Sequence, residues 1–184
     1  MNSAVLGFLF ITTIGTLLHF VYEWSGRIKL VALIGAVNES TWEHMKIAAI
    51  PAFVWSIVEI PFHGDNPNFI AARLVAVATI LLAIPLIFYG YQLFTRKSIL
   101  ALDIGLFVAS IGLGQWLSAL VLKSDPVPVI VTSICFILLV VLFAACLLLT
   151  LMPIRGFLFR DPISGKYGIE AFYAHTHDME ADEC

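Results

Sequence analysis

Residues 38–46, with the sequence Asn-Glu-Ser-Thr-Trp-Glu-His-Met-Lys, concentrate the groups of this chain that can do chemistry. They supply two carboxylates, an imidazole, an amide and an ammonium, in a chain of which 60% of the residues are hydrophobic and only 12% are charged. Ionisable groups that lie in or beside hydrocarbon cost free energy and mark functional sites. We therefore predict that this segment forms part of a functional site.

A metal site is the first function that these residues suggest, because imidazole and carboxylate together suit zinc, iron or manganese. Residues four apart lie on one face of a helix, and His19 and Glu23 have this spacing. Glu43 and His44 are adjacent within the 38–46 segment. We predict that these four residues bind a divalent transition metal. The residues expected to support them are Asn38, Glu39, Lys46 and Asp103.

Three functions fit this polar cluster. A metal that activates water would make the protein a metal-dependent membrane hydrolase. Buried histidine and carboxylate side chains also carry protons, so the second function is a small ion-coupled or proton-coupled transporter, most readily as a homodimer. In the third, the residues form only interfacial ion pairs and caps, with Glu43 as the capping glutamate and Lys46 as its partner. The sequence leaves all three functions open.

A second polar group, the outer cluster, lies near the far end of the same predicted helix. Its members are Glu59, His63 and Arg73, and the first two are four residues apart. Glu59 follows His44 by 15 residues, which is about 22 Å at the helical rise per residue. One metal ion cannot bridge that distance. We expect Arg73, together with Gln115, to be the partner of this group, as a structural ion pair or an outer gate.

Five apolar runs predict an all-α, polytopic membrane protein. The runs are residues 4–24, 47–62, 69–93, 99–122 and 127–151. Each approaches or exceeds the roughly 20 residues that cross a bilayer, and apolar runs in hydrocarbon must be helical to pair their backbone groups. We expect five transmembrane helices in one domain, residues 1–152, followed by a short tail, residues 153–184. Residues 28–37 are too few to span and are expected to be interfacial or re-entrant.

The second helix is predicted to begin at Ser40. Ser40 and Glu43 match a capping box, in which a serine hydroxyl and a glutamate three residues later satisfy the first free amides of a helix. With that start, the short run 47–62 becomes long enough to span.

The distribution of Lys and Arg predicts the orientation. These residues gather in the first and third connections and in the tail, and basic residues favour the cytoplasmic side. We expect a cell-membrane protein with its N-terminus outside and its tail in the cytoplasm. The lipid bilayer is the expected partner, and nucleic acid is not, because no basic patch is mixed with aromatic residues. His175 and His177 in the tail are interpreted as part of a solvated end and not as a metal motif.

The 38–46 segment, preceded by Leu18-His19-Phe20-x-Tyr22-Glu23, resembles an uncharacterised family of small bacterial integral membrane proteins with an Asn-Glu-Ser-x-Trp-Glu-His motif. The resemblance extends to Asp161-Pro162 and Tyr167-Gly168 in the tail. It implies a bacterial membrane protein. It carries no activity and assigns no catalytic role to any residue.

Overall fold

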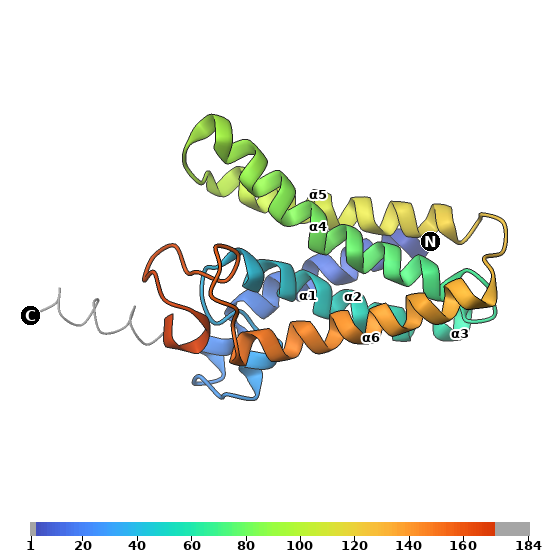
Figure 1. Ribbon diagram of the computed structural model, residues 1–184, viewed down its shortest axis with the longest axis horizontal. Helices are drawn as coiled ribbons and strands as arrows, with labels where there is room; N and C mark the ends of the chain where they lie inside the picture. The colour runs from blue at the N-terminus through green and yellow to red at the C-terminus, as the bar shows by residue number, and fades with distance from the viewer. Residues whose placement is uncertain (1–2, 172–184) are drawn as a thin grey trace, which may run out of the picture.

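The protein is all-helical in the computed structural model, which describes residues 3–171 (Figure 1). The helices are α1 (Ser3–Trp24), the 3-10 helix η1 (Val31–Leu33), α2 (Thr41–Val58), α3 (Ile60–His63), α4 (Phe69–Thr95), α5 (Leu100–Val121) and α6 (Val129–Leu151). The only β contact in these residues is an isolated bridge between Arg160 and Tyr167. The tail motif with His175 and His177 lies outside the described residues.

Four helices are long and apolar enough to cross a membrane: α1, α4, α5 and α6. They correspond to four of the five predicted spans. The helix α2 has 18 residues and is not among the four, because Glu43, His44 and Lys46 make its first turns polar. It is also the most enclosed helix: from Trp42 to Phe53 every residue except His44 is buried. The charged side chains of Glu43 and Lys46 therefore face protein and not lipid.

Close packing of α1 against α2 depends on two glycines of α1. A Cβ added to Gly7 would lie 2.5 Å from Trp55 Nε1, and one added to Gly15 would lie 2.8 Å from the carbonyl oxygen of Ile47. Both distances are shorter than a side chain can tolerate. The missing side chains allow the two helices to lie directly against each other (Figure 1).

The two helices run antiparallel and match end to end. The ring centroids of His19 in α1 and His44 in α2 are 5.2 Å apart. At the opposite end, the Ser3 hydroxyl at the start of α1 bonds to the carboxylate of Glu59, which caps the end of α2. The polar start of α2 therefore lies at the same depth as the end of α1.

The connection between α1 and α2 closes one end of the bundle. Ala32 and Val37 are fully buried, whereas Ile28 and Leu30 are 53% and 74% exposed. The alternation gives this segment one face toward the protein and one apolar face outward.

The first part of the tail folds across the same end of the bundle (Figure 1). Phe159 and Asp161 are buried there. The Trp42 amide donates to the Leu158 carbonyl over 2.9 Å, and the rings of Trp42 and Phe159 are 4.8 Å apart. The tail is thus part of the structure that holds the 38–46 segment.

Candidate functional site

The start of α2 is held by the side chains that precede it. Ser40 caps the helix: its hydroxyl accepts a bond from the Glu43 amide over 3.4 Å. Asn38 accepts from the Ser40 amide over 2.8 Å and donates to the Gly168 carbonyl over 2.9 Å. The predicted start of the helix and the serine half of the capping box are confirmed. The Glu43 carboxylate does not return to the Ser40 amide, because Asn38 already occupies that amide.

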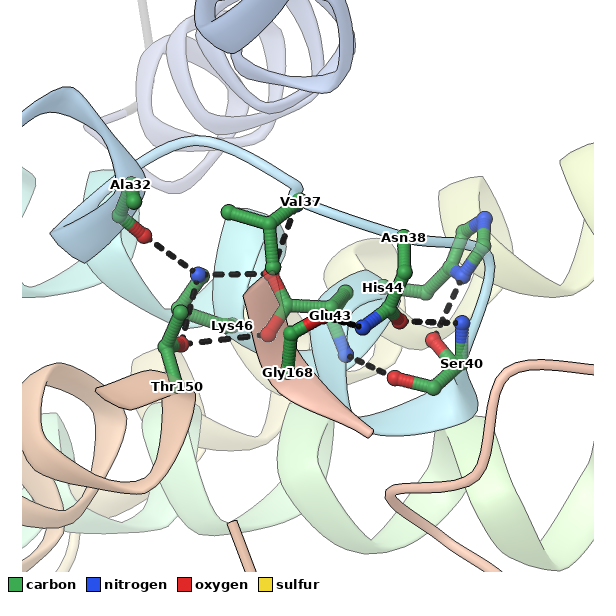
Figure 2. A network of polar contacts seen from close by, with 9 residues as sticks. All are labelled: Ala32, Val37, Asn38, Ser40, Glu43, His44, Lys46, Thr150 and Gly168. Carbon is green, nitrogen blue, oxygen red and sulfur yellow. Dashed lines mark hydrogen bonds and ion pairs between the residues drawn. The ribbon is translucent and has the colours of Figure 1, made fainter. Parts of the chain in front are cut away.

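Glu43 points into the bundle and forms a buried network with Lys46 (Figure 2). Its carboxylate accepts bonds from the Val37 amide over 3.0 Å and from the Thr150 hydroxyl over 3.1 Å. Lys46 Nζ donates to Glu43 over 2.6 Å, to the Ala32 carbonyl over 2.9 Å and to Thr150 over 2.7 Å. All three ammonium hydrogens are thereby used. The pairing of Glu43 with Lys46 was among the predicted alternatives.

His44 faces the other side of α2, toward His19 and Glu39. The Glu39 carboxylate lies between the two imidazoles, with Oε1 3.8 Å from His19 Nε2 and Oε2 3.7 Å from His44 Nε2. One ligand atom from each of the three residues fits within 4.8 Å of the other two. We call this group the His19–Glu39–His44 triad. It is partly exposed, since the three side chains are 29%, 45% and 35% accessible.

The orientation of His44 is set by the backbone. Its Nδ1 lies 3.0 Å from the Ser40 carbonyl oxygen. A carbonyl can only accept, so Nδ1 carries a proton, and in the neutral imidazole Nε2 then presents its lone pair to the triad. Metal-binding histidines are commonly oriented through a carbonyl in this way.

Glu39 is positioned by the tail. Its backbone amide donates to Asp161 Oδ1 over 3.2 Å. Asp161 is 1% exposed, and its other oxygen accepts from the amide and hydroxyl of Ser164 over 2.8 and 2.5 Å. The tail thereby fixes the backbone that carries the only carboxylate of the triad.

The structure separates the eight residues expected at this site. It brings His19, His44 and Glu39 together and turns Glu43 and Lys46 into the buried network. Glu23 is exposed at the end of α1 and is not a member of the triad. Asp103 bonds instead to the hydroxyls of Tyr91 and Ser98 between α4 and α5. Asn38 supports the backbone.

A cavity of about 360 Å³ adjoins the triad and shares Glu39 with it. Its other polar walls are Thr41, Tyr89, Arg160 and Asp161. The Tyr89 and Thr41 hydroxyls are 2.9 Å apart. Of these four residues, the sequence analysis singled out only Asp161, because Asp161-Pro162 is part of the motif shared with the resembled family. Sequence reasoning also missed Thr150 of the buried network. The only signal was an isolated hydroxyl side chain near the end of the apolar run 127–151.

The outer cluster gathers at the opposite end of α2. Glu59 pairs with Arg73, and His63 Nδ1 lies 4.0 Å from Glu59 Oε1. Arg73 also donates to the Ser118 hydroxyl over 2.5 Å. Glu59 and Arg73 are 2% and 3% exposed. A buried ion pair thus lies at this end of the bundle as well.

A family model described as a family of unknown function (DUF6512) matches residues 3–169. The match includes the seven helices named above, the triad, the buried network, the outer cluster and nearly all of the described tail. It agrees with the expected membership in an uncharacterised family. No curated protein and no solved structure matches the chain.

Proposed function

This chain belongs to DUF6512, a family of unknown function, and we propose that it is a multi-pass membrane protein with a catalytic metal centre. The ligands are His19, Glu39 and His44, the ion is zinc, iron or manganese, and the reaction is hydrolysis. This ligand set keeps both histidines of the sequence prediction and replaces Glu23 and Glu43 with Glu39.

The geometry of the triad carries this proposal. A tetrahedral ion with ligand bonds of about 2.0–2.2 Å holds its ligand atoms roughly 3.4 Å apart. Glu39 Oε1 lies 3.8 Å from His19 Nε2 and Glu39 Oε2 lies 3.7 Å from His44 Nε2. One ligand atom from each of the three residues lies within 4.8 Å of the other two, so side-chain shifts of roughly 1 Å would bring them to the spacing of such a site. Two imidazoles and one carboxylate are also a donor set used by catalytic zinc and by non-haem iron.

Hydrolysis is favoured over a structural metal because three protein ligands leave a position open. A metal with an open position lowers the pKa of a bound water to near neutrality and supplies a nucleophile. The triad is partly exposed and shares Glu39 with the 360 Å³ cavity. Within that cavity Arg160 offers positive charge to a developing oxyanion, and the Tyr89 hydroxyl offers a hydrogen bond. The substrate is an ester, amide or phosphoester presented at the membrane surface.

We propose five membrane spans, with α2 as the fifth. The support is the matched antiparallel packing of α1 and α2, in which Ser3 meets Glu59 and His19 meets His44. If α1 crosses the bilayer, α2 crosses it as well, because the two helices contact each other at both ends. The Lys and Arg distribution supports an N-terminus outside the cell, with the triad and tail at the cytoplasmic face of the cell membrane.

Metal analysis of the purified full-length protein tests the proposal. We expect about one equivalent of metal in the wild type and in Glu23→Ala, and less than a tenth of that in Glu39→Ala and His44→Ala. Glu23→Ala is the matched control, because it removes a carboxylate from the same end of the bundle but from outside the triad. Equal metal in all four proteins, or none in the wild type after reconstitution, would reject the metal centre. Chelator-sensitive hydrolysis of a p-nitrophenyl fatty-acid ester tests the reaction class.

A proton-coupled transporter is the second candidate. Its support is the pair of buried ionic groups at the two ends of α2, Glu43 with Lys46 and Glu59 with Arg73, since ionisable groups inside membrane proteins often lie on proton pathways. Such a transporter would be expected to act as a homodimer. Proton flux in proteoliposomes that is abolished by Lys46→Met and unaffected by chelators would favour it over the hydrolase.

A further inference from the structure

We propose that the outer cluster is a binding site for a singly charged oxyanion, such as a carboxylate or a phosphodiester. The outer cavity has a volume of about 260 Å³. Its polar walls include Glu59, His63, Asn66, Arg73, Gln115 and Lys123. It lies at the end of the bundle opposite the triad, so it is separate from the proposed metal centre.

Arg73 is the centre of this site and its hydrogen bonding is incomplete. One terminal nitrogen pairs with Glu59 and the other donates to Ser118. The third nitrogen, Nε, is buried and has no hydrogen-bond partner within residues 3–171. A buried donor without a partner costs about 1–3 kcal/mol. A ligand that accepts a hydrogen bond at this position would remove that cost.

Gln115 is a second buried polar group that faces the cavity without a protein partner. Its residue is 3% exposed and it lines the cavity. No hydrogen bond joins its amide to any residue in the described part of the chain. Its Oε1 lies beside Gly7 of α1, and because buried polar groups normally have a hydrogen-bond partner, the NH₂ group is the part of this side chain that a ligand in the cavity would satisfy. The amide NH₂ can donate to the same ligand as Arg73.

The charges around the cavity favour an anion. Arg73 and Lys123 are positive and Glu59 is negative, so these three side chains leave one positive charge when His63 is neutral. Glu59 is already engaged by Arg73 and Ser3, whereas Lys123 is exposed at the rim. A single negative charge would balance the site, and a doubly charged ion would overcompensate it.

A ligand with two adjacent oxygen atoms matches the donors that line this cavity. In the proposed complex one oxygen accepts from Arg73 Nε and the Gln115 amide, and the other faces the Lys123 ammonium at the rim. The volume is below the roughly 300 Å³ of the smallest typical ligand pockets, so only a carboxylate or phosphodiester group enters and the rest of a larger molecule stays outside. A free carboxylate and an anionic lipid headgroup share this chemistry.

Thermal unfolding of the purified full-length protein in a nonionic detergent tests the proposal. Sodium acetate is titrated against sodium chloride at equal ionic strength, and phosphatidylglycerol is compared with phosphatidylcholine in mixed micelles. We expect a saturable rise in Tm with acetate, with phosphatidylglycerol, or with both. Acetate alone would identify a soluble ligand, and phosphatidylglycerol alone would identify a lipid headgroup.

Three variants complete the test. Gln115→Met and Lys123→Met should weaken the apparent affinity at least tenfold, because each removes one donor while keeping the size of the side chain. Lys97→Met, an exposed lysine in the connection between α4 and α5, is the control and should respond like the wild type. The proposal is overturned if neither anion raises the wild-type Tm, or if Gln115→Met and Lys123→Met respond like Lys97→Met. Removing metal with a chelator should leave the anion effect unchanged.

Discussion

Lys46 Nζ lies 2.6 Å from Glu43 Oε2, and the two side chains are 0% and 2% exposed. The pair joins α2 to the α1–α2 connection through Ala32 and to the end of α6 through Thr150 (Figure 2). Because a buried charge is tolerated only when it is paired and hydrogen-bonded, this pair fixes how three segments meet beneath the triad.

Lys46→Met should destabilise the protein by about 3–5 kcal/mol, because it leaves the Glu43 carboxylate buried and unpaired. The double variant Glu43→Gln/Lys46→Met should be less destabilised than Lys46→Met alone, since no unpaired charge remains. Chemical unfolding in detergent measures both, with Lys97→Met as an exposed control that should stay within about 0.5 kcal/mol of the wild type. Equal stability of Lys46→Met and Lys97→Met would show that the buried pair does not hold this end of the bundle.

Asp161→Ala should lower the metal affinity of the triad by about 10–100-fold, which is the usual effect of removing a group that positions a ligand. The physical reason is the bond from the Glu39 amide to Asp161 Oδ1. Asp161→Asn retains that acceptor and should recover most of the affinity. Metal titration of the apoprotein is the measurement, and Asp125→Ala, at the other end of the bundle, is the control. An unchanged affinity in Asp161→Ala would separate the tail from the metal site.

Gly168→Ala should destabilise the docking of the tail by about 1–3 kcal/mol, as expected for a non-glycine residue forced into a strained backbone conformation. Gly168 has φ +53°, and an added Cβ would lie 2.8 Å from the Thr150 carbonyl oxygen. Gly156→Ala is the matched control, because nothing lies within 4 Å of its Cβ position. Limited proteolysis of the tail compares the two variants. Equal cleavage rates would mean that the tail does not depend on this close approach.

Cysteine labelling should reveal the five proposed spans. In a chain without its native cysteines, Asp65→Cys should react with a membrane-impermeant thiol reagent in intact cells, and Lys97→Cys should react only after lysis. If α2 did not cross the membrane and the N-terminus stayed outside, the two positions would exchange their reactivity. A cysteine at position 123 provides an independent check, because Asn66 donates to the Leu122 carbonyl and places both segments at one end.

Much of the fold follows from the sequence. The apolar runs anticipated α1, α4, α5 and α6, because backbone pairing in hydrocarbon permits little besides helix. Ser40 marked the start of α2 for a purely local reason, namely the free amides of a first helical turn. The sequence also identified both histidines of the triad and the three members of the outer cluster, since ionisable residues are rare in such a chain.

Tertiary structure decided which carboxylate joins the histidines. The spacing of His19 and Glu23 indicates a shared face of α1, but it does not say which face meets α2. Glu39 and Glu43 are also four apart, yet α2 begins between them at its N-cap Ser40. Glu39 therefore lies outside the helix and turns toward His44, whereas Glu43 lies in its first turn and turns toward Lys46. Asp161 then fixes Glu39 from a segment 122 residues away. Local rules determine where a helix begins, whereas the partner of an ionisable group depends on how distant segments pack.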